Sequence, residues 1–256
     1  MPVNTAHNNA GTRWDSVLTS VYRRSGQVSL TEMTSSEFQG KKALVTGGTS
    51  GIGKAIADAL QQAGAQVKAV GLPELDVSDQ SQVDDLVASL DGLDILVNSA
   101  GIIVRDSEFT LPVFEQVIDV NLTGTMRLCA GCKPLLAQSK GCIVNVASML
   151  SFFGGARVPA YSASKGGVAQ LTKSLAIAWA PEHIRVNAIA PGWIATNLTA
   201  ALQQDPTGSA QILARTPMNR WGTPEDIAGP VLFLCSQAAA FVTGAILPVD
   251  GGYSIR

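Results

Sequence analysis

The sequence predicts an α/β fold: one domain built on a doubly wound parallel sheet with helices on both faces. From Lys41 onward, short apolar segments alternate with longer helical patterns, as in repeated βαβ units. A glycine-rich turn at residues 46–53 separates the first apolar segment from the first helical pattern, where such sheets bind ligands. A chain of 256 residues with 46% hydrophobic content can bury one large core. One domain is therefore expected, over residues 38–256.

Each expected strand is a short apolar segment followed by small or polar residues. The strands are expected at residues 43–45, 66–70, 94–97, 142–146, 185–189 and 245–249. The first helix is expected over 52–63, directly after the glycine-rich turn. Because ligands gather at the carboxyl ends of parallel strands, Asn98, Ser148 and Pro191 are candidate site residues.

Residues 1–37 form an N-terminal extension without a glycine loop or a catalytic pattern. Its apolar residues have the spacing of an amphipathic helix: Trp14, Val17, Leu18, Val21 and Tyr22. We expect an arm that docks on the domain or on a neighbouring subunit. A flexible tail and a targeting peptide are the alternatives, and the region lacks the apolar core of a secretory signal.

Composition indicates a small-molecule partner. The 18 basic and 20 acidic residues give a net charge of -2, which provides no footprint for nucleic acid or for an anionic membrane. No apolar run reaches the roughly 20 residues that a membrane-spanning helix needs. A cytoplasmic protein is expected.

The four cysteines favour the same compartment. Cys129 and Cys132 have the spacing of a redox or metal pair, but there is no second pair and the chain has only two histidines. We therefore expect buried, reduced thiols and no metal site, as is usual in the cytosol.

Tyr161 and Lys165 are the first candidates for catalysis. On a helix over 161–179 they form an i, i+4 pair, so the ammonium lies close to the phenol. One positive charge at about 5 Å lowers the pKa of a phenol by about two units from its ordinary value near ~10, which suits a proton donor and acceptor. Ser148 would then hold the substrate oxygen while a nicotinamide exchanges hydride. The same pair also occurs on solvated helix faces, and the glycine-rich turn is what favours the catalytic interpretation.

The glycine-rich turn favours a dinucleotide. It reads Thr46-Gly47-Gly48-Thr49-Ser50-Gly51-Ile52-Gly53. Its glycines permit positive φ angles and close backbone approach, while the helix that follows presents free N–H groups to a pyrophosphate. Between a strand and a helix, this pattern is typical of a Rossmann-type site.

In the order of these motifs the chain resembles the short-chain dehydrogenase/reductase family. The resemblance spans residues 40–256 and rests on the glycine-rich turn, Asn98-Ser99-Ala100-Gly101, Asn121, Ser148, Tyr161-x-x-x-Lys165 and Pro191-Gly192. It implies catalytic roles for Asn121, Ser148, Tyr161 and Lys165, with Asn121 supporting a proton-relay water. It implies a homotetramer with long helices over 106–137 and 161–179 at the dimer contacts. The implied cofactor site comprises Gly47, Thr49, Ser50, Gly51, Ile52, Gly53, Asp76, Val77, Asn98, Ala100, Gly101, Tyr161, Lys165, Pro191, Gly192, Ile194 and Thr196.

A closer likeness covers residues 147–256. The stretches at 148–161, 190–197 and 220–224 are similar to those of 2-dehydro-3-deoxy-D-gluconate 5-dehydrogenases and their 2-deoxygluconate-oxidising relatives. The likeness implies interconversion of a secondary alcohol and a ketone on a sugar acid or related polyol.

The substrate pocket is expected to combine arginines with apolar walls. Arg105 and Arg157 could bind a carboxylate at the pocket mouth, or could form surface or intersubunit salt bridges. Phe153 stands where the similar enzymes tend to have a polar residue, which favours a less hydrated substrate group. The other candidate walls are Ile103, Leu150 and Trp193, with a core position as the alternative for Trp193. Residues 193–217 are expected to form a lid.

One crossover is too short for a full set of strands. Only residues 71–75 separate the second strand from Asp76, whereas a helical crossover needs at least about 10 to 12 residues. One helix and one strand of the family's usual sheet are therefore missing, and we expect six strands with 66–70 at the edge. Lys68 would discourage pairing at that edge, which residues 1–37 are expected to cover.

The same deletion affects cofactor choice. An acid at the end of the second strand normally selects NAD, and a nearby arginine selects NADP. Here Gly71 and Leu72 occupy that place and no basic residue follows. We therefore favour NAD over NADP, with Glu74 as a ribose ligand.

Two other functions fit the same motifs. A reductase of carrier-bound or free 3-oxoacyl groups would use the same catalytic residues, with a basic surface toward the carrier. A non-catalytic NAD-binding redox sensor is less favoured, because every residue of the implied catalytic set is present.

Overall fold

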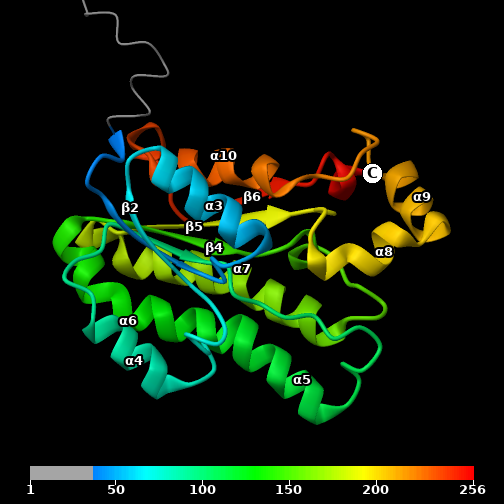
Figure 1. Ribbon diagram of the computed structural model, residues 1–256, viewed down its shortest axis with the longest axis horizontal. Helices are drawn as coiled ribbons and strands as arrows, with labels where there is room; N and C mark the ends of the chain where they lie inside the picture. Colours follow the sequence, from blue (N-terminus) through cyan, green and yellow to red (C-terminus); the bar gives the residue numbers. More distant parts are fainter. Residues whose placement is uncertain (1–36) are drawn as a thin grey trace, which may run out of the picture.

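The computed structural model describes residues 37–256, which form one parallel sheet with helices on both faces (Figure 1). Its strands are β1 Lys42–Thr46, β2 Gln66–Val70, β3 Ile95–Asn98, β4 Cys142–Val146, β5 Arg185–Pro191 and β6 Ile246–Val249. They lie in the order β2-β1-β3-β4-β5-β6, and every neighbouring pair is parallel. The expected doubly wound α/β sheet is thus confirmed.

The strand β2 is at the edge of the sheet, as the short crossover predicts. It pairs with β1 from Lys42 opposite Gln66 to Thr46 opposite Val70. Lys68 on this edge donates a hydrogen bond to the Ser89 hydroxyl at 2.9 Å. Over residues 37–256 the sheet therefore has six strands, as expected. The predicted helix near residues 14–22, and the predicted covering of this edge by the N-terminal extension, lie outside the described residues.

The helices form two layers, one on each face of the sheet. Figure 1 shows α3 and α10 on one face and α4, α5, α6 and α7 on the other. Their bounds are α3 Gly51–Gln62, α4 Gln80–Ala88, α5 Leu111–Ile118, α6 Gly124–Ser139, α7 Pro159–Trp179, α8 Ala200–Gln204, α9 Pro206–Arg215 and α10 Pro224–Cys235. Among these helices, none is both long and apolar enough to cross a lipid bilayer.

Alternation along the strands divides the core between the two layers. Ala43 and Val45 of β1 pack with Leu60 of α3 and belong to the core under α3 and α10. Leu44 points to the opposite face and packs with Leu128 of α6 in the second core. Successive strand side chains point to opposite faces, so an apolar strand serves both cores at once.

The single long helix expected over 106–137 is wrong in its first part and interrupted in its middle. Asp106 has a positive φ of 67°, and α5 begins only at Leu111. A π-helical turn at Asp119–Thr123 then separates α5 from α6. Such turns insert an extra residue into a helix and are frequent at functional sites. Here the turn carries Asn121, which is completely buried.

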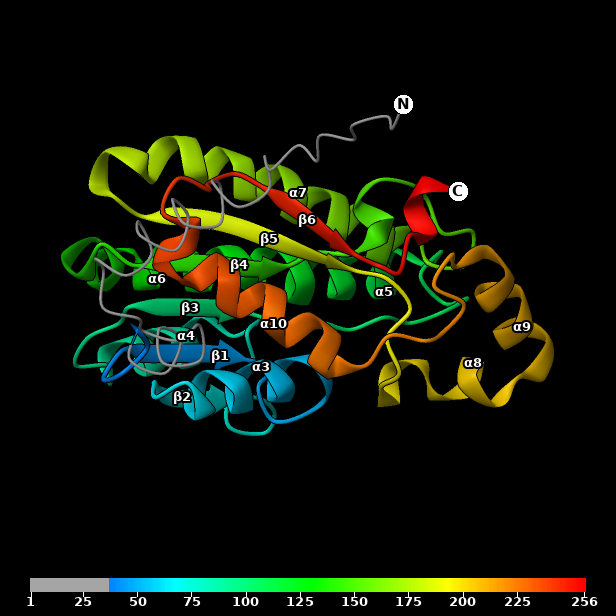
Figure 2. The ribbon, with the colours of Figure 1, turned by 90° about the horizontal axis from the view of Figure 1, so that it is seen from above.

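The lid segment lies beyond the carboxyl ends of the strands. Figure 2 shows α8 and α9 at the end of the sheet to which the strands point, with the C-terminus beside them. Asp205 begins α9 by accepting a hydrogen bond from the Thr207 amide at 3.1 Å, which is a common way to start a helix. Residues far apart in the sequence thus meet over the sheet's ligand-binding edge.

Candidate active site

The glycine-rich turn between β1 and α3 forms a backbone cradle. Gly47 and Gly51 have positive φ angles of 63° and 51°, a region that favours glycine. A Cβ atom on Gly47 would lie 2.8 Å from the Ala100 amide nitrogen, and one on Gly53 would lie 2.2 Å from the Gly47 carbonyl oxygen. Only glycine fits these two positions. The cradle and the free N–H groups of the α3 N-terminus therefore fit a dinucleotide pyrophosphate.

Many residues of the expected cofactor site line a cavity of about 310 Å³ at this cradle. They are Gly47, Ser50, Gly51, Ile52, Gly53, Ala100, Gly101, Tyr161, Lys165 and Thr196. Four further lining residues were missed by sequence reasoning: Ser99, Val146, Asn197 and Leu198. Ser99 and Val146 end or follow apolar strands, so their position at the sheet edge was the available signal.

The other expected cofactor residues do not line this cavity. Pro191, Gly192 and Ile194 line the adjoining cavity described below. Asp76 accepts hydrogen bonds from the amide and hydroxyl of Ser78. Val77 is buried against Gly124, where a Cβ would come within 2.7 Å of it.

Thr49 and Asn98 also stand apart from the cofactor cavity. Thr49 is exposed and lies against Gly71 at the end of β2. Asn98 is buried and donates to the Asn145 side-chain oxygen at 2.9 Å. Its own side-chain oxygen has no partner among the described residues. Asn98 therefore ties β3 to β4 beneath the site.

Ser148, Tyr161 and Lys165 converge beside the cradle. Ser148 follows β4, and its hydroxyl accepts a hydrogen bond from the Leu150 amide at 3.1 Å. The Tyr161 phenol is hydrogen-bonded to Ser148. The Lys165 ammonium lies 5.6 Å from the centre of the Tyr161 ring and donates to the Val146 carbonyl at 2.6 Å. One turn of α7 and the end of β4 thus position all three groups.

Burial dominates the proton affinities of this cluster. Desolvation raises the pKa of the Tyr161 phenol, while the hydrogen bond with Ser148 and the positive charge of Arg105 act in the opposite direction. Burial lowers the pKa of Lys165 to about 8. The expectation that Lys165 lowers the phenol pKa is therefore wrong in its net direction, because sequence spacing does not reveal how far the site is desolvated.

Asn121 holds the loop that follows β3. Its side-chain oxygen accepts from the Ile102 amide at 2.8 Å, and its side-chain nitrogen donates to the Ile102 carbonyl at 2.9 Å. The same nitrogen lies 3.1 Å from the Ser164 hydroxyl, which in turn donates to the Tyr161 carbonyl. Asn121 thereby connects the loop to the catalytic helix.

Glu108 is a site residue that sequence reasoning missed. Its side chain is completely buried, and its two oxygens accept hydrogen bonds from the amides of Val104 and Tyr161 at 2.9 and 2.8 Å. It thus fixes the start of α7 and the loop across from it. Its neighbourhood in the sequence does not signal its contact with α7, since Tyr161 is 53 residues away.

A larger cavity of about 580 Å³ adjoins the cofactor cavity. The catalytic Ser148 and Tyr161 line it. So do all the residues expected to contact substrate, namely Ile103, Arg105, Leu150, Phe153, Arg157 and Trp193. This is the place where an alcohol could meet both the phenol and a nicotinamide.

Arg105 and Arg157 line this cavity in different states. Arg157 is exposed and forms a two-pronged ion pair with Asp106, in which the distance from Nε to Oδ1 is 2.7 Å. Arg105 is half-buried and donates to the Leu198 carbonyl at 3.2 Å. Burial lowers the pKa of Arg105, and the nearby Tyr161 opposes that effect. Of the two arginines, Arg105 is therefore the one whose charge affects the pKa of the Tyr161 phenol.

The lid and the C-terminal turn supply further walls that sequence reasoning missed. Arg215 ends α9, and Tyr253 begins the last helical turn of the chain. The Arg215 guanidinium carbon lies 4.2 Å from the centre of the Tyr253 ring and 5.2 Å from that of Phe153. No local pattern could have found these contacts, because each joins segments far apart in the chain.

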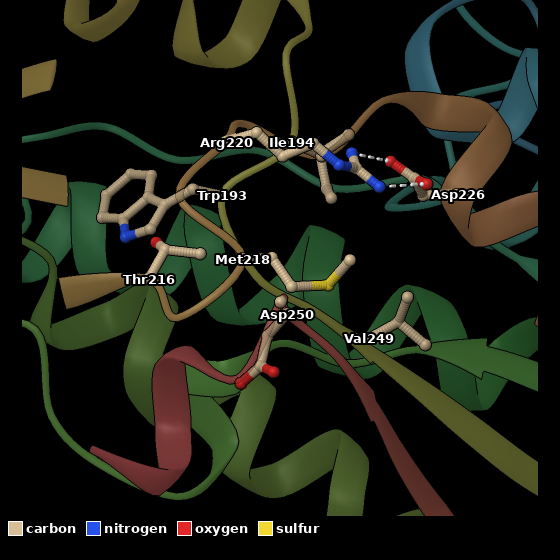
Figure 3. A pocket seen from close by; sticks show the side chains of 10 residues that line it. Trp193, Ile194, Thr216, Met218, Arg220, Asp226, Val249 and Asp250 are labelled. Carbon is tan, nitrogen blue, oxygen red and sulfur yellow. Dashed lines mark hydrogen bonds and ion pairs between the residues drawn. The ribbon is translucent and has the colours of Figure 1, made fainter. Parts of the chain in front are cut away.

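Trp193 lines both the substrate cavity and a smaller one of about 140 Å³, which Figure 3 shows. The smaller cavity is bordered by the ion pair of Arg220 and Asp226. Trp193 meets the rings of Trp221 and Tyr253 edge-on, and its indole N–H has no partner among the described residues. Trp193 is thus a cavity wall, as expected, and packs among aromatic rings as well.

The cysteines take no part in this site. Cys129, Cys132 and Cys142 are buried, and all four thiols are free. Burial raises the pKa of Cys132 to about 12 and that of Cys129 still further. Over residues 37–256 no cluster of three or more potential metal ligands occurs.

A glycine cradle beside a Ser–Tyr–Lys cluster defines a dinucleotide-dependent oxidoreductase. The family model described as enoyl-(acyl carrier protein) reductase matches residues 68–254. The chain is 43% identical over 248 residues to 2-dehydro-3-deoxy-D-gluconate 5-dehydrogenase of Pseudoalteromonas atlantica, covering 86% of this chain and 98% of the relative. It is 42% identical over 246 residues to the enzyme of that name from Escherichia coli, covering 86% and 97%.

Solved structures of similar proteins have the same fold as this chain. A putative 2-deoxy-D-gluconate 3-dehydrogenase from Agrobacterium tumefaciens with bound NADP is 46% identical, with a TM-score of 0.80 over 86% of this chain and 98% of that one. The chain belongs to the short-chain dehydrogenase/reductase family, and it is an NAD(P)-dependent oxidoreductase acting on CH–OH groups. The family resemblance found in the sequence is confirmed.

Proposed function

We propose that the protein interconverts a secondary alcohol and a ketone on a sugar acid, with NAD as the cofactor. The observation that carries the proposal is a cavity that joins the catalytic Ser148 and Tyr161 to three arginines. Guanidinium groups bind carboxylates through paired, charge-assisted hydrogen bonds. The names of the similar enzymes, which refer to gluconate derivatives, support the same substrate class.

The catalytic residues have separate roles in proton transfer. A nicotinamide held at the glycine cradle would supply the hydride acceptor for oxidation and the hydride donor for reduction. Ser148 holds the substrate oxygen, and the Tyr161 phenol exchanges the proton with that oxygen. The Lys165 ammonium lies beside the ring and favours the ionised phenol when the alcohol is oxidised. Asn121 holds the loop after β3 against α7 through its hydrogen bonds with Ile102 and Ser164.

Arg105 is the proposed cation near the reacting carbon. It comes from the loop that follows β3, it is half-buried, and its charge acts on the Tyr161 phenol. A cation at this place favours the ionised phenol and attracts an anionic substrate into the cavity. Arg157 is a weaker candidate, because Asp106 already neutralises it.

NAD is proposed over NADP because of the segment after β2. Residues 71–76 contain no lysine or arginine, and Glu74 is exposed there. Lys54, on the first turn of α3, is ion-paired with Asp58 at 2.6 Å. A 2′-phosphate would therefore meet no positive charge in this segment, whereas Glu74 can accept a hydrogen bond from a ribose hydroxyl. The A. tumefaciens structure contains NADP, so the ratio of kcat/KM for NAD and NADP tests this part directly.

We also propose a homotetramer. Large apolar side chains are exposed on the helices that the family resemblance places at subunit contacts, including Leu111 on α5, Met126 on α6 and Ile177 on α7. Exposed apolar residues on neighbouring helices favour association between copies. Light scattering coupled to size-exclusion chromatography measures the mass, and a monomer would contradict the proposal.

The substrate class is tested by initial rates. Purified protein is supplied with NAD or NADP and with a panel of sugar acids, their neutral alditols and 3-hydroxyacyl thioesters. The proposal predicts NAD-linked oxidation of a sugar acid with the highest kcat/KM of the panel. A preference for thioesters would instead support the 3-oxoacyl reductase alternative.

A further inference from the structure

Three arginines line the substrate cavity, and they differ in the interaction partners that their guanidinium groups have within the protein. Arg157 is held by Asp106, and Arg105 donates to the Leu198 carbonyl. Arg215 has no acidic partner and no hydrogen-bond acceptor among residues 37–256. Its described contacts are the faces of two aromatic rings, from Phe153 and Tyr253. Arg215 is thus the cavity's uncommitted guanidinium.

The two rings fix the position of this guanidinium. Phe153 and Tyr253 lie nearly parallel, with centres 6.1 Å apart and planes inclined by 29°. An arginine over aromatic faces gains cation–π attraction and keeps its N–H donors free at its edge. Because each side chain comes from a different segment, the loop after β4, α9 or the C-terminal turn, the position depends on all three.

We propose that Arg215 binds the carboxylate of the substrate, and that Phe153 and Tyr253 orient it for that purpose. This inference rests on the proposed sugar-acid function and names the residue that selects the acid. It also gives Phe153 a role, because its ring supports the arginine. Tyr253 and Phe153 are positioning residues, since they act through Arg215.

The part of the cavity near Ser148 and Tyr161 and the part near Arg215 carry different chemical groups. Ser148 and Tyr161 hold the reacting carbon's oxygen, and Arg105 acts electrostatically on the phenol. Arg215 comes from α9 in the lid, so it can bind a substrate group at the end away from the reacting carbon. A planar carboxylate that accepts two N–H donors from one guanidinium fits this end better than a hydroxymethyl group does.

The test compares 2-deoxy-D-gluconate with its alditol, which carries CH₂OH in place of the carboxylate. Arg215→Gln is expected to raise KM for the acid by about 10- to 100-fold, the value of a charge-assisted hydrogen-bonded pair. Its kcat/KM for the alditol and its KM for NAD should stay within about threefold of the wild type. Arg215→Lys keeps the charge but not the planar fork, so it should recover part of the loss.

The matched control is Arg220→Gln. Arg220 is five residues away, borders the smaller cavity and is ion-paired with Asp226. Its substitution should change KM for the acid by no more than about threefold. Tyr253→Phe keeps the ring under Arg215, whereas Tyr253→Leu removes it and should raise KM for the acid alone. Unchanged acid KM in Arg215→Gln would overturn the proposal.

A second readout separates this inference from the proposed function. Tartrate, a small dicarboxylate, is used as a competitive inhibitor of whichever alcohol the enzyme oxidises. If the wild type does not prefer the acid over the alditol, the proposed function fails. Loss of tartrate affinity by about tenfold in Arg215→Gln would then still support an anion site at Arg215. Equal tartrate inhibition of wild type and variant would exclude that site.

Discussion

The cofactor cavity and the substrate cavity share Tyr161 but are built from different kinds of segments. The cofactor cavity is bordered by the glycine-rich turn and the start of α3, the loop after β3, the end of β4, one turn of α7 and the segment after β5. The substrate cavity adds residues of α8, α9 and the C-terminal turn, which lie over the same edge (Figure 2). Loops anchored directly to buried strands are held in place by the sheet, whereas the lid is held by side-chain contacts such as those of Arg215.

The reaction and the selection of substrate are therefore assigned to different segments of the chain. Substitutions of Ser148, Tyr161 or Lys165 should affect the turnover of every substrate. Substitutions in the lid should affect substrates according to their charge.

Tyr161→Phe should reduce kcat for acid and neutral substrates alike by about 10²- to 10⁴-fold, because it removes the proton donor and acceptor. The ring and its packing remain, so thermal denaturation should be nearly unchanged. Initial rates on the acid and its alditol measure the effect. A loss confined to one of the two substrates would contradict the assignment of Tyr161 to the chemical step.

Lys165→Met should abolish most activity while stabilising the fold at pH 7. The pKa of Lys165 is lowered to about 8, so the folded state disfavours its charged form. Below pH 8 the wild type carries that cost in full, and it is relieved as the pH rises from about 8 toward the ordinary lysine value. The variant should gain up to about 3 kcal/mol at pH 7, less whatever is lost with the hydrogen bond to Val146.

Denaturant unfolding at several pH values measures this gain. The advantage of Lys165→Met should shrink as the pH rises through 8 to 10. A constant difference across that range would show that burial does not disfavour the ammonium.

Glu108→Gln should destabilise the protein by about 1 to 2 kcal/mol, because an amide cannot accept from both backbone amides through two oxygens. It should also lower kcat, since Tyr161 loses the bond that fixes its backbone. Thermal unfolding and initial rates provide the two measurements. Glu115→Gln, an exposed position on α5, is the control and should behave as wild type.

Arg157→Gln should have the smallest effect, with KM for a sugar acid changing by no more than about threefold. The arginine is exposed and Asp106 neutralises it. Steady-state kinetics on the acid and its alditol check this. A tenfold rise in KM for the acid alone would move the carboxylate ligand from Arg215 to Arg157.

The predicted parts of the molecule share a property: their signals are local. The glycine cradle, the pair of Tyr161 and Lys165, and the short connection after Val70 each span a few residues. Six parallel strands and their edge follow from such patterns. The strand ends then meet at one edge because parallel strands all point the same way.

The missed parts depend on contacts between distant segments. Arg215 meets Phe153 and Tyr253 across 62 and 38 residues, and Glu108 meets Tyr161 across 53. The phenol pKa was misjudged for a related reason, since desolvation by the whole fold outweighs nearby charges. The turn at Asp106 lies between Val104 and Glu108, which are hydrogen-bonded to each other, and Asn121 of the π-helical turn bonds to Ile102 in the same loop.

Ser148, Tyr161 and Lys165, at the end of β4 and on α7, perform the reaction, while Arg215 of the lid selects an acid. The most direct measurement is the ratio of kcat/KM for 2-deoxy-D-gluconate to that for its alditol, with NAD, in the wild type and in Arg215→Gln. The account predicts a ratio of at least about tenfold in the wild type that falls toward one in the variant. A wild-type ratio near one, or an equal ratio in both proteins, would contradict it.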